Sequence, residues 1–341
     1  MEVYRTLPPL AERRPCALTI GNFDGVHLGH QAMLAQLVDL AASADLARKA
    51  AAAQDHEPLA RCVLTFEPHP RDFFAASRGQ PSVPRISTER DKLEALAANG
   101  VDRVCIANFN QTLASMSAEL FVKEIIADGL MAKTLLIGDD FRFGARRQGD
   151  FNLLSQLSGQ FGYELHRTST VTVDEQRVSS SRVRSALAQG DFIQLERLLG
   201  RRYAISGHVI HGRQLGRELG FPTINLRLPF PQPALSGIFV VRVHGIKASK
   251  GGSADGQGLP AVASLGTRPA VEHNGRFLLE VHLLDFNGDL YGDLLRVEFL
   301  GKLRNEENFD SLDLLKDQIA IDTAQARAWF AAPQETNVQS Q

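Results

Sequence analysis

The residues best suited to chemistry lie in the decapeptide Gly21–His30, which reads GNFDGVHLGH. It follows an apolar stretch and opens a helical pattern, a placement that points backbone N–H groups and the helix dipole at an anion. Its glycines allow the backbone to approach a ligand closely, and His27 and His30 are spaced to face the same ligand. Two imidazoles there can donate hydrogen bonds to a triphosphate and stabilise an α-phosphate under attack. The pattern predicts a nucleotide cradle; the alternative is a glycine-rich turn with two surface histidines.

Two further segments lie next to elements that could build such a cradle. Gly138–Gly144, GDDFRFG, follows an apolar stretch, and Val178–Arg184, VSSSRVR, precedes a helical pattern. Arg184 can bind a phosphate bidentately, and the serines can cap the helix. Taken alone, the second segment is more simply explained by a helix cap and solvated arginines. Glu67 and His69 follow another strand, and their residue types leave open whether they contact a substrate.

A second phosphate-handling segment lies at 207–225, GHVIHGRQLGRELGFPTIN, and the chain has no Walker motif. Thr223 and Asn225 are two residues apart in an extended segment, so their side chains share a face. A hydroxyl and an amide oxygen side by side suit Mg²⁺, which prefers oxygen ligands. The alternative is a glycine-rich loop followed by a proline turn. Three glycines, Gly212, Gly216 and Gly220, would allow the backbone to form a loop around phosphates.

The stretch 277–283 has the alternation of a half-buried strand. Every second residue from Phe277 to Leu283 is apolar, so Glu280 and His282 point to the other face. A carboxylate on that face can act as a general base. From the residues alone, a solvent-exposed strand glutamate is the simpler interpretation.

The elements that would position the first group of residues alternate between strand and helix. Strands are predicted at Cys16–Ile20, Cys62–Phe66, Arg103–Ile106 and Thr134–Ile137, and helices at His30–Ala42, Glu89–Ala98, Ser117–Ile126 and Asn152–Phe161. This order indicates a parallel α/β sheet covered on both faces, which binds ligands at the carboxyl ends of its strands. The Ala-rich stretch Ala41–Ala60 is predicted to be a lengthened helix end or a surface insert.

The second half indicates a small antiparallel barrel instead. Its strands are predicted at Tyr203–Ile210, Gly237–Val243, Arg276–Asp285 and Leu294–Leu300. Asn287-Gly288 lies between the last two of them and predicts a hairpin. Ser185–Leu199 is predicted to be one helix that connects the halves, and a terminal helix is predicted from about Ser311 to Phe330.

Bulk properties narrow the class of protein. A length of 341 residues suggests two domains. Lys and Arg total 37 and Asp and Glu total 39, so the basic excess of a nucleic-acid-binding protein is absent. Three scattered cysteines predict neither a disulfide framework nor a zinc site. No signal peptide or membrane-spanning stretch is recognised, so we expect a cytoplasmic protein; the composition leaves its oligomeric state open.

Together the motifs resemble a known family. The HxGH signature of a nucleotidyltransferase superfamily stands at His27–His30, and nearly the whole chain is similar to the bacterial bifunctional riboflavin kinase/FAD synthetases. The motifs GNFDGVHxGH, TFEPHP, GxDFRFG and SSTxIR of that family correspond to Gly21–His30, Thr65–Pro70, Gly138–Gly144 and Ser179–Arg184, with Ser181 replacing the usual threonine. The fold class implied is α/β. Residues 1–186 would form a Rossmann-like parallel-sheet domain that transfers AMP from ATP to FMN and releases pyrophosphate.

The resemblance also implies residue roles in this domain. His27 and His30 would be the catalytic pair that holds the ATP phosphates. The nucleotide would be bound by further residues of the motifs: Gly21, Asn22, Phe23, Asp24, Gly29, Asp140, Arg142, Ser179 and Arg184.

Residues 187–330 resemble the riboflavin kinase domain, an antiparallel β-barrel with a terminal helix, and 331–341 would be a disordered tail. The family segment GFPTAN stands here as GFPTIN, with Ile224 in place of alanine. Thr223 and Asn225 would hold Mg²⁺, and Glu280 would be the base that activates the riboflavin 5′-hydroxyl. The nucleotide would be bound by Gly212, Gly216, Gly220 and Pro222, and the flavin would contact Arg304 and Phe309.

The resemblance therefore implies two consecutive ATP-dependent reactions, from riboflavin to FMN and from FMN to FAD, with these small molecules as the partners. One departure concerns Ser264–Ala270, where the family has an asparagine and a threonine near the kinase site. Two alternatives follow from it. One is an FMN adenylyltransferase with an impaired kinase module, and the other is a non-catalytic flavin-binding protein.

Overall fold

The computed structural model describes residues 1–51, 57–212, 216, 219–229, 232–253, 256–266 and 277–332. They form two units. The first contains Met1–Val83 and Lys92–Ser179, and the second contains Pro84–Asp91 with the chain from Ser180 onward. The tail predicted at 331–341 lies almost entirely outside the described residues. The same holds for residues 267–270 of the stretch Ser264–Ala270, where the sequence departs from the family. No helix in the described ranges is long and apolar enough to cross a membrane.

The first unit is built on a six-stranded parallel sheet in the order β1-β4-β3-β2-β5-β6. The strands are β1 (Glu2–Tyr4), β2 (Cys16–Ile20), β3 (Ala60–Glu67), β4 (Arg103–Asn108), β5 (Ala132–Ile137) and β6 (Glu164–Arg167). From β2 the chain adds β3 and β4 on one side, and β5 and β6 on the other. The direction of winding thus reverses between β2 and β5, which is where sheets of this kind bind ligands.

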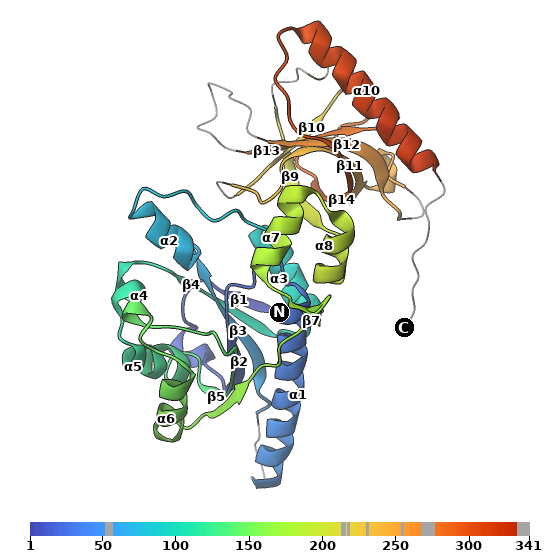
Figure 1. Ribbon diagram of the computed structural model, residues 1–341. Coiled ribbons are helices and arrows are strands. Elements are labelled where there is room, and N and C mark those ends of the chain that lie inside the picture. Colours follow the sequence, from blue (N-terminus) through green and yellow to red (C-terminus); the bar gives the residue numbers. More distant parts are fainter. Residues whose placement is uncertain are drawn as a thin grey trace. The chain divides into compact units, whose positions relative to one another are not determined.

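Helices cover both faces of this sheet, as Figure 1 shows. The helical elements are α1 (Leu28–Ala51), α2 (Pro70–Ala76), α3 (Glu89–Ala98), α4 (Gln111–Ser115), α5 (Ala118–Phe121), a π-helical segment (Val122–Ala127) and α6 (Phe151–Phe161). Alternate residues of β2 divide between the two layers. Leu18 packs with Phe121 and Leu154 from α5 and α6, whereas Ala17 packs with Leu37 from α1. Burial on both faces explains why the central strands are mostly apolar.

Most of the predicted elements of this unit are confirmed. The central strands lie where they were expected, and the Ala-rich stretch begins as the long end of α1. Ser117 does not belong to a helix but caps one, because its side chain accepts a hydrogen bond from the Leu120 N–H. The edge strands β1 and β6 were not predicted, since both are short and partly exposed.

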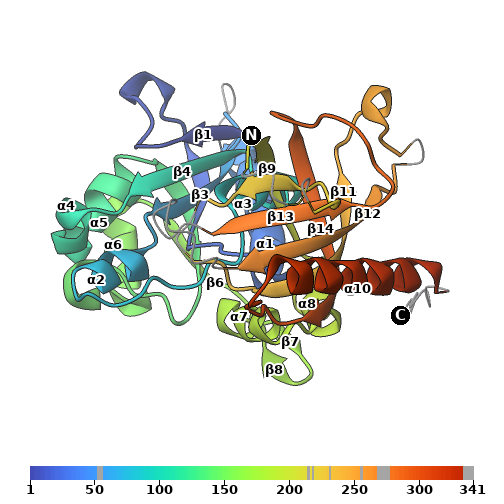
Figure 2. The ribbon, with the colours of Figure 1, turned by 90° about the horizontal axis from the view of Figure 1, so that it is seen from above.

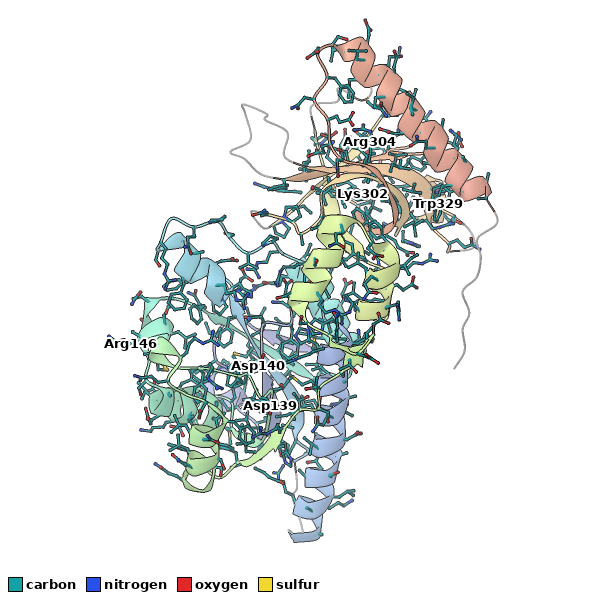
Figure 3. The ribbon with its side chains drawn as sticks, in the orientation of Figure 1. Asp139, Asp140, Arg146, Lys302, Arg304 and Trp329 are labelled. Atoms are coloured by element: carbon teal, nitrogen blue, oxygen red, sulfur yellow. The ribbon has the colours of Figure 1, made fainter. Side chains whose placement is uncertain are left out.

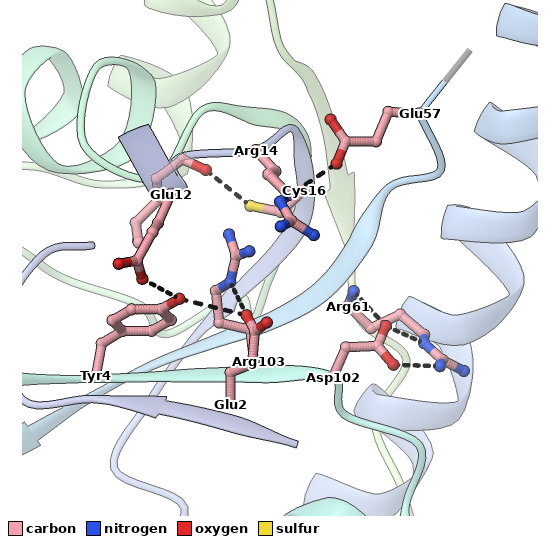
Figure 4. Close-up of polar contacts among 10 residues, drawn as sticks. Glu2, Tyr4, Glu12, Arg14, Cys16, Glu57, Arg61, Asp102 and Arg103 are labelled. Atoms are coloured by element: carbon pink, nitrogen blue, oxygen red, sulfur yellow. Dashed lines mark hydrogen bonds and ion pairs between the residues drawn. The ribbon is translucent and has the colours of Figure 1, made fainter. Parts of the chain in front are cut away.

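Polar contacts gather near the amino end of the sheet, and Figure 4 draws them. The Arg103 guanidinium, 2% exposed, donates to Glu2, and Arg61 Nε donates to Asp102 at 2.7 Å. Burial acts to raise the pKa of Asp102, but the hydrogen bonds from Arg61 outweigh it and lower that pKa. The cysteines of β2, β3 and β4 are free and buried, and burial raises the pKa of Cys105 to about 12. These contacts lie away from the carboxyl ends of the strands, where the motifs stand.

The second unit is a closed antiparallel barrel in the order β10-β13-β12-β11-β14-β9. The strands are β9 (Ala204–Ile210), β10 (Ile224–Arg227), β11 (Gly237–His244), β12 (Leu259–Gly266), β13 (Leu278–Leu283) and β14 (Leu294–Arg304). Helix α10 (Leu312–Ala331) lies along the outside of the barrel (Figure 2) and packs on Ile238, Val240 and Val262. The small elements β7 (Thr172–Val173) and β8 (Gln176–Arg177) form a separate ribbon in the first unit.

The second unit also contains a segment from the middle of the first half, Pro84–Asp91. The Tyr203 hydroxyl donates to the Ile86 carbonyl at 2.7 Å, and the Ser206 N–H donates to the Asp91 carboxylate at 3.1 Å. These buried bonds attach the segment to the start of β9. The domain boundary predicted between residues 186 and 187 stays a prediction.

Two predictions for the second half are wrong. The connecting helix is two helices, α7 (Ser180–Gln189) and α8 (Phe192–Leu199), because Gly190 has a φ of 71° and Asp191 caps the second helix. The Asn287-Gly288 hairpin does not form. Strand β13 pairs with β10 and β12, whereas β14 pairs with β9 and β11, so the intervening segment joins strands on opposite sides of the barrel.

Candidate active sites

The first candidate site begins with His27, which caps helix α1. Its carbonyl accepts the Gln31 N–H at 3.0 Å, and its ring Nδ1 accepts the His30 N–H at 3.3 Å. A side-chain acceptor at this position satisfies one of the free N–H groups at a helix start. Because Nδ1 is an acceptor, the proton of the neutral ring is on Nε2. His27, 5% exposed, therefore presents an N–H donor from Nε2.

The His30 ring stacks on the His27 ring, with centroids 3.7 Å apart and an angle of 13° between the planes. Burial, the neighbouring His27 and the charge of Lys92 together hold the pKa of His30 well below its ordinary value. The His30 Nδ1 atom is buried and has no hydrogen-bond partner among the described residues. Buried polar atoms are normally satisfied, so an open one at this position is suited to a ligand.

The loop before α1 holds both rings close to the backbone. Phe23 and Val26 are fully buried in left-handed conformations, with φ of 49° and 39°. Such backbone is costly for a non-glycine residue and persists where its surroundings fix it. A Cβ added at Gly29 would lie 3.2 Å from His27 Nδ1 and 3.4 Å from the Val178 carbonyl. A side chain at position 29 would therefore crowd the His27 ring, and the Val178 carbonyl lies close to the histidine pair.

The motif after β5 lies at the same edge of the sheet, since β2 and β5 are neighbours. Asp140, labelled in Figure 3, is exposed and pairs with Arg177 at 3.1 Å. Arg142 is also exposed, and its guanidinium donates to the Phe141 carbonyl. The Asn22 side-chain oxygen is buried and unpaired within the described part of the chain. The structure thus brings the motifs after β2 and β5 to the switch point of the sheet.

The other predicted residues are placed differently. Arg184 belongs to the second unit, where its Nε donates to the Pro84 carbonyl at 2.7 Å. His69 caps α2, because its Nδ1 accepts the Arg71 N–H at 3.1 Å. That contact gives His69 a structural role, which its residue type had left open.

The second candidate site is a row of polar side chains across three strands. In the barrel ladders, Glu280 of β13 stands directly opposite Asn225 of β10 and Ser264 of β12. Directly paired residues of antiparallel strands point to the same face. Their neighbours Leu279 and Val281 are fully buried inside the barrel. The predicted alternation of β13 is confirmed, and Glu280 lies on the outer face in a row of oxygen-bearing side chains.

The glycine-rich segment packs on one end of this row. A Cβ at Gly212 would collide with the amide of Asn225, and one at Gly216 would lie 3.3 Å from Thr223 Oγ1. The His282 Nδ1 donates to the Pro222 carbonyl at 2.9 Å and so fixes the turn before β10. The Thr223 hydroxyl, the Asn225 amide and the backbone at Gly212 and Gly216 therefore lie close together at this end of the Glu280 row.

Arg304 has a partner that the sequence did not reveal. Its guanidinium forms two hydrogen bonds, of 2.9 and 2.8 Å, with the carboxylate of Asp322, which is 2% exposed. The guanidinium also lies 5.7 Å from the centre of the Phe309 ring. Arg304 thus ties the end of β14 to α10 (Figure 3) and places Phe309 beside it.

These two sites define a class of protein: a nucleotide-dependent transferase with an HxGH cradle in a parallel-sheet unit and an oxygen-rich row on a β-barrel unit. The FAD synthetase family model matches residues 10–182, and the riboflavin kinase family model matches 199–330. The chain belongs to the bifunctional riboflavin kinase/FMN adenylyltransferase family.

Relatives with that name are similar over nearly the whole chain. The one from Pseudomonas fluorescens is 44% identical, covering 98% of this chain and 99% of its own. The one from Escherichia coli K12 is 41% identical, covering 94% of each chain. A solved structure titled a macrolide-efflux protein from Streptococcus pneumoniae is 28% identical, with a TM-score of 0.69 over 96% of this chain and 98% of its own. The similarity therefore extends over both units of this chain and over nearly the whole length of these relatives.

Proposed function

We propose that this chain phosphorylates riboflavin to FMN with ATP and then transfers AMP from a second ATP to FMN, giving FAD and pyrophosphate. The observation that carries the proposal is the presence of both family domains in one chain. ATP is the co-substrate of both reactions. The alternatives of an impaired kinase and of a flavin-binding protein without turnover remain outcomes of the assay below.

Adenylyl transfer takes place at the HxGH cradle. A phosphate oxygen of FMN attacks the α-phosphorus of ATP, the bond to the bridging oxygen breaks, and pyrophosphate leaves. The His27 Nε2–H donates to the phosphates and stabilises the charge that develops. His30 is neutral before ATP binds, so it also acts by hydrogen bonding. Positioning and charge stabilisation are sufficient for such a transfer.

The remaining nucleotide contacts in this unit stay predictions. Backbone of the strained loop approaches the phosphates, and the exposed side chains after β5 line the nucleotide. The residues of this unit proposed for this role are Gly21, Asn22, Phe23, Asp24, Gly29, Asp140, Arg142 and Ser179. Arg184 was predicted for the same role but belongs to the second unit, and its role stays a prediction.

Phosphorylation of riboflavin takes place at the barrel row. The Glu280 carboxylate accepts the proton of the riboflavin 5′-hydroxyl, whose oxygen attacks the γ-phosphorus. The Thr223 hydroxyl and the Asn225 amide oxygen are hard donors beside this carboxylate, so they fit Mg²⁺. When bound, Mg²⁺ neutralises charge on the transferring phosphate. Phosphates contact the segment that contains Gly212, Gly216, Gly220 and Pro222.

The flavin is proposed to lie near Arg304 and Phe309. Because Arg304 is held by Asp322, its part is to fix the Phe309 ring, which covers the flavin by stacking. The near-zero net charge supports small phosphorylated partners rather than nucleic acid, and the cytoplasm remains the proposed location.

One assay tests the proposal. The purified protein is incubated with riboflavin, ATP and Mg²⁺, and FMN and FAD are separated by chromatography. Transient FMN followed by FAD is expected. FAD formed from added FMN but not from riboflavin would support the impaired kinase, and binding without any conversion would support the non-catalytic alternative.

A further inference from the structure

Lys92 is a buried cation next to the HxGH cradle, and the adenylyl-transfer mechanism proposed above gives it no role. Lys92 lies on α3 and is only 5% exposed. Lysines are almost never fully buried, because a charge removed from water must be compensated. A lysine on a helix of this composition would be expected at the surface, so its burial needs a reason.

Helix α3 turns Lys92 toward the cradle loop. Lys92 and Leu96 are one helical turn apart and lie on the same face of α3. Leu96 is fully buried against Phe23 and Val26 of the loop. The Phe23 ring in turn lies 4.9 Å from the His30 ring. All of these residues belong to the first unit.

Lys92 adds a fixed positive charge to the surroundings of the histidine pair. The Lys92 ammonium is close enough to help lower the pKa of His30, after burial and His27. His30 is therefore neutral at pH 7, while the buried Asp24 of the same loop contributes a negative charge. Neutral imidazoles supply donors but little net charge, and an ATP triphosphate needs cations to compensate it.

We propose that Lys92 is a further phosphate-binding residue of the adenylyl-transfer site, whose ammonium group contacts the triphosphate of ATP. The inference rests on the proposed adenylyl transfer. Lys92 supplies the positive charge, and the histidine pair supplies directional hydrogen bonds to the same phosphates. In the other role open to Lys92, it neutralises Asp24 and stabilises the loop without touching the nucleotide.

Kinetics of Lys92→Met separate these roles. We expect the KM for ATP in FAD formation from FMN to rise about ten-fold or more, as for the loss of one charged hydrogen bond. FMN formation from riboflavin should be unchanged, because it takes place in the other unit. Lys92→Arg should recover part of the affinity. Lys123→Met removes an exposed lysine of the same unit and should have no effect.

Titration of His30 by NMR tests whether the charge of Lys92 reaches the cradle. Loss of the Lys92 charge should raise the pKa of His30, whereas Lys92→Arg should leave it low. An unchanged KM for ATP in Lys92→Met would overturn the proposal, whatever the His30 titration shows. Absence of FAD formation in the wild type would overturn the proposed function instead.

A measurement on the wild type covers the case in which Lys92→Met fails to fold. With lysine labelled at ¹³Cε, the Lys92 resonance should shift on addition of pyrophosphate, and the Lys123 resonance should not. Lys92→Arg assigns the signal. A Lys92 resonance that does not respond to saturating pyrophosphate would overturn the proposal whatever the stability of the variants.

Discussion

His27 and His30 lie on the first turn of α1, yet their imidazoles are held in different ways. His27 is fixed by a backbone hydrogen bond that also decides which nitrogen carries its proton. His30 is fixed by stacking, and its electrostatic surroundings keep it neutral. The pair therefore offers a donor fixed by a helix-capping bond and a neutral His30 ring to an anion, which avoids the cost of burying a second charge at His30.

Stability of the first unit should fall on mild acidification because of His30. Its pKa is lower in the folded protein than in the unfolded chain, where it is about 6.5. Between these values the unfolded chain binds more protons, so the free energy of unfolding decreases as the pH falls below about 6.5, by up to about 1.4 kcal/mol per pH unit. The decrease in the free energy of unfolding is measured by hydrogen exchange of the β2 amides at pH 7.5 and 5.5, with the rates corrected for intrinsic exchange.

His30→Gln should lose less stability than the wild type over this interval. Equal losses in the wild type and in His30→Gln would contradict the assigned environment of His30.

How far single residues could be predicted depends on whether their role is local. The face of Glu280 followed from alternation along its own strand, and the histidine pair followed from spacing at a helix start. The burial of Lys92 and the contact of Arg304 with Asp322 depend on elements that meet only in the fold. No local pattern distinguishes these charged residues from ordinary surface ones.

At the scale of elements, the barrel register assembles the second site. Residues 225, 264 and 280 come from three different strands, β10, β12 and β13. Only the pairing of these strands in the barrel places them in one row. Strand β12, which is rich in small residues, was not predicted, and the very short β10 was predicted only as an extended segment around Thr223 and Asn225. The Asn-Gly signal failed because the barrel order, not the local turn, decides which strands pair.

The contact between β14 and α10 makes a prediction about the second unit. Asp322→Ala leaves the partly buried Arg304 guanidinium without its carboxylate, so we expect a loss of about 3 kcal/mol in the free energy of unfolding. Urea unfolding followed by the fluorescence of Trp329, the one tryptophan in the chain, reports on α10 itself.

Asp285→Ala is the matched control for this measurement. It removes an ion pair of similar geometry between Arg327 of α10 and Asp285, just after β13, but that pair is exposed to solvent and should matter little. An Asp322→Ala variant as stable as Asp285→Ala would show that the buried pair does not hold α10 to the barrel.

At the scale of the whole molecule, one chain carries two proposed phosphate-handling sites of unlike construction. The first uses a helix start at the switch point of a parallel sheet, and the second uses the outer face of a barrel. Each site is built from residues of its own unit, apart from Arg184, which was predicted for the first site and belongs to the second unit. The product of the barrel reaction is the substrate of the sheet reaction, so the sites can act in sequence without a shared intermediate on the protein.

The product profiles of His27→Asn and Glu280→Gln test this account most directly. Asparagine keeps a helix-capping side chain but lacks the imidazole donor, and glutamine keeps the shape of Glu280 but cannot take a proton. With riboflavin and ATP, His27→Asn should stop at FMN, with FAD formation slowed at least about 100-fold. Glu280→Gln should make FAD only from added FMN, and a mixture of the two variants should make FAD from riboflavin. A folded variant that loses both activities, or a mixture that stops at FMN, would contradict two separate sites.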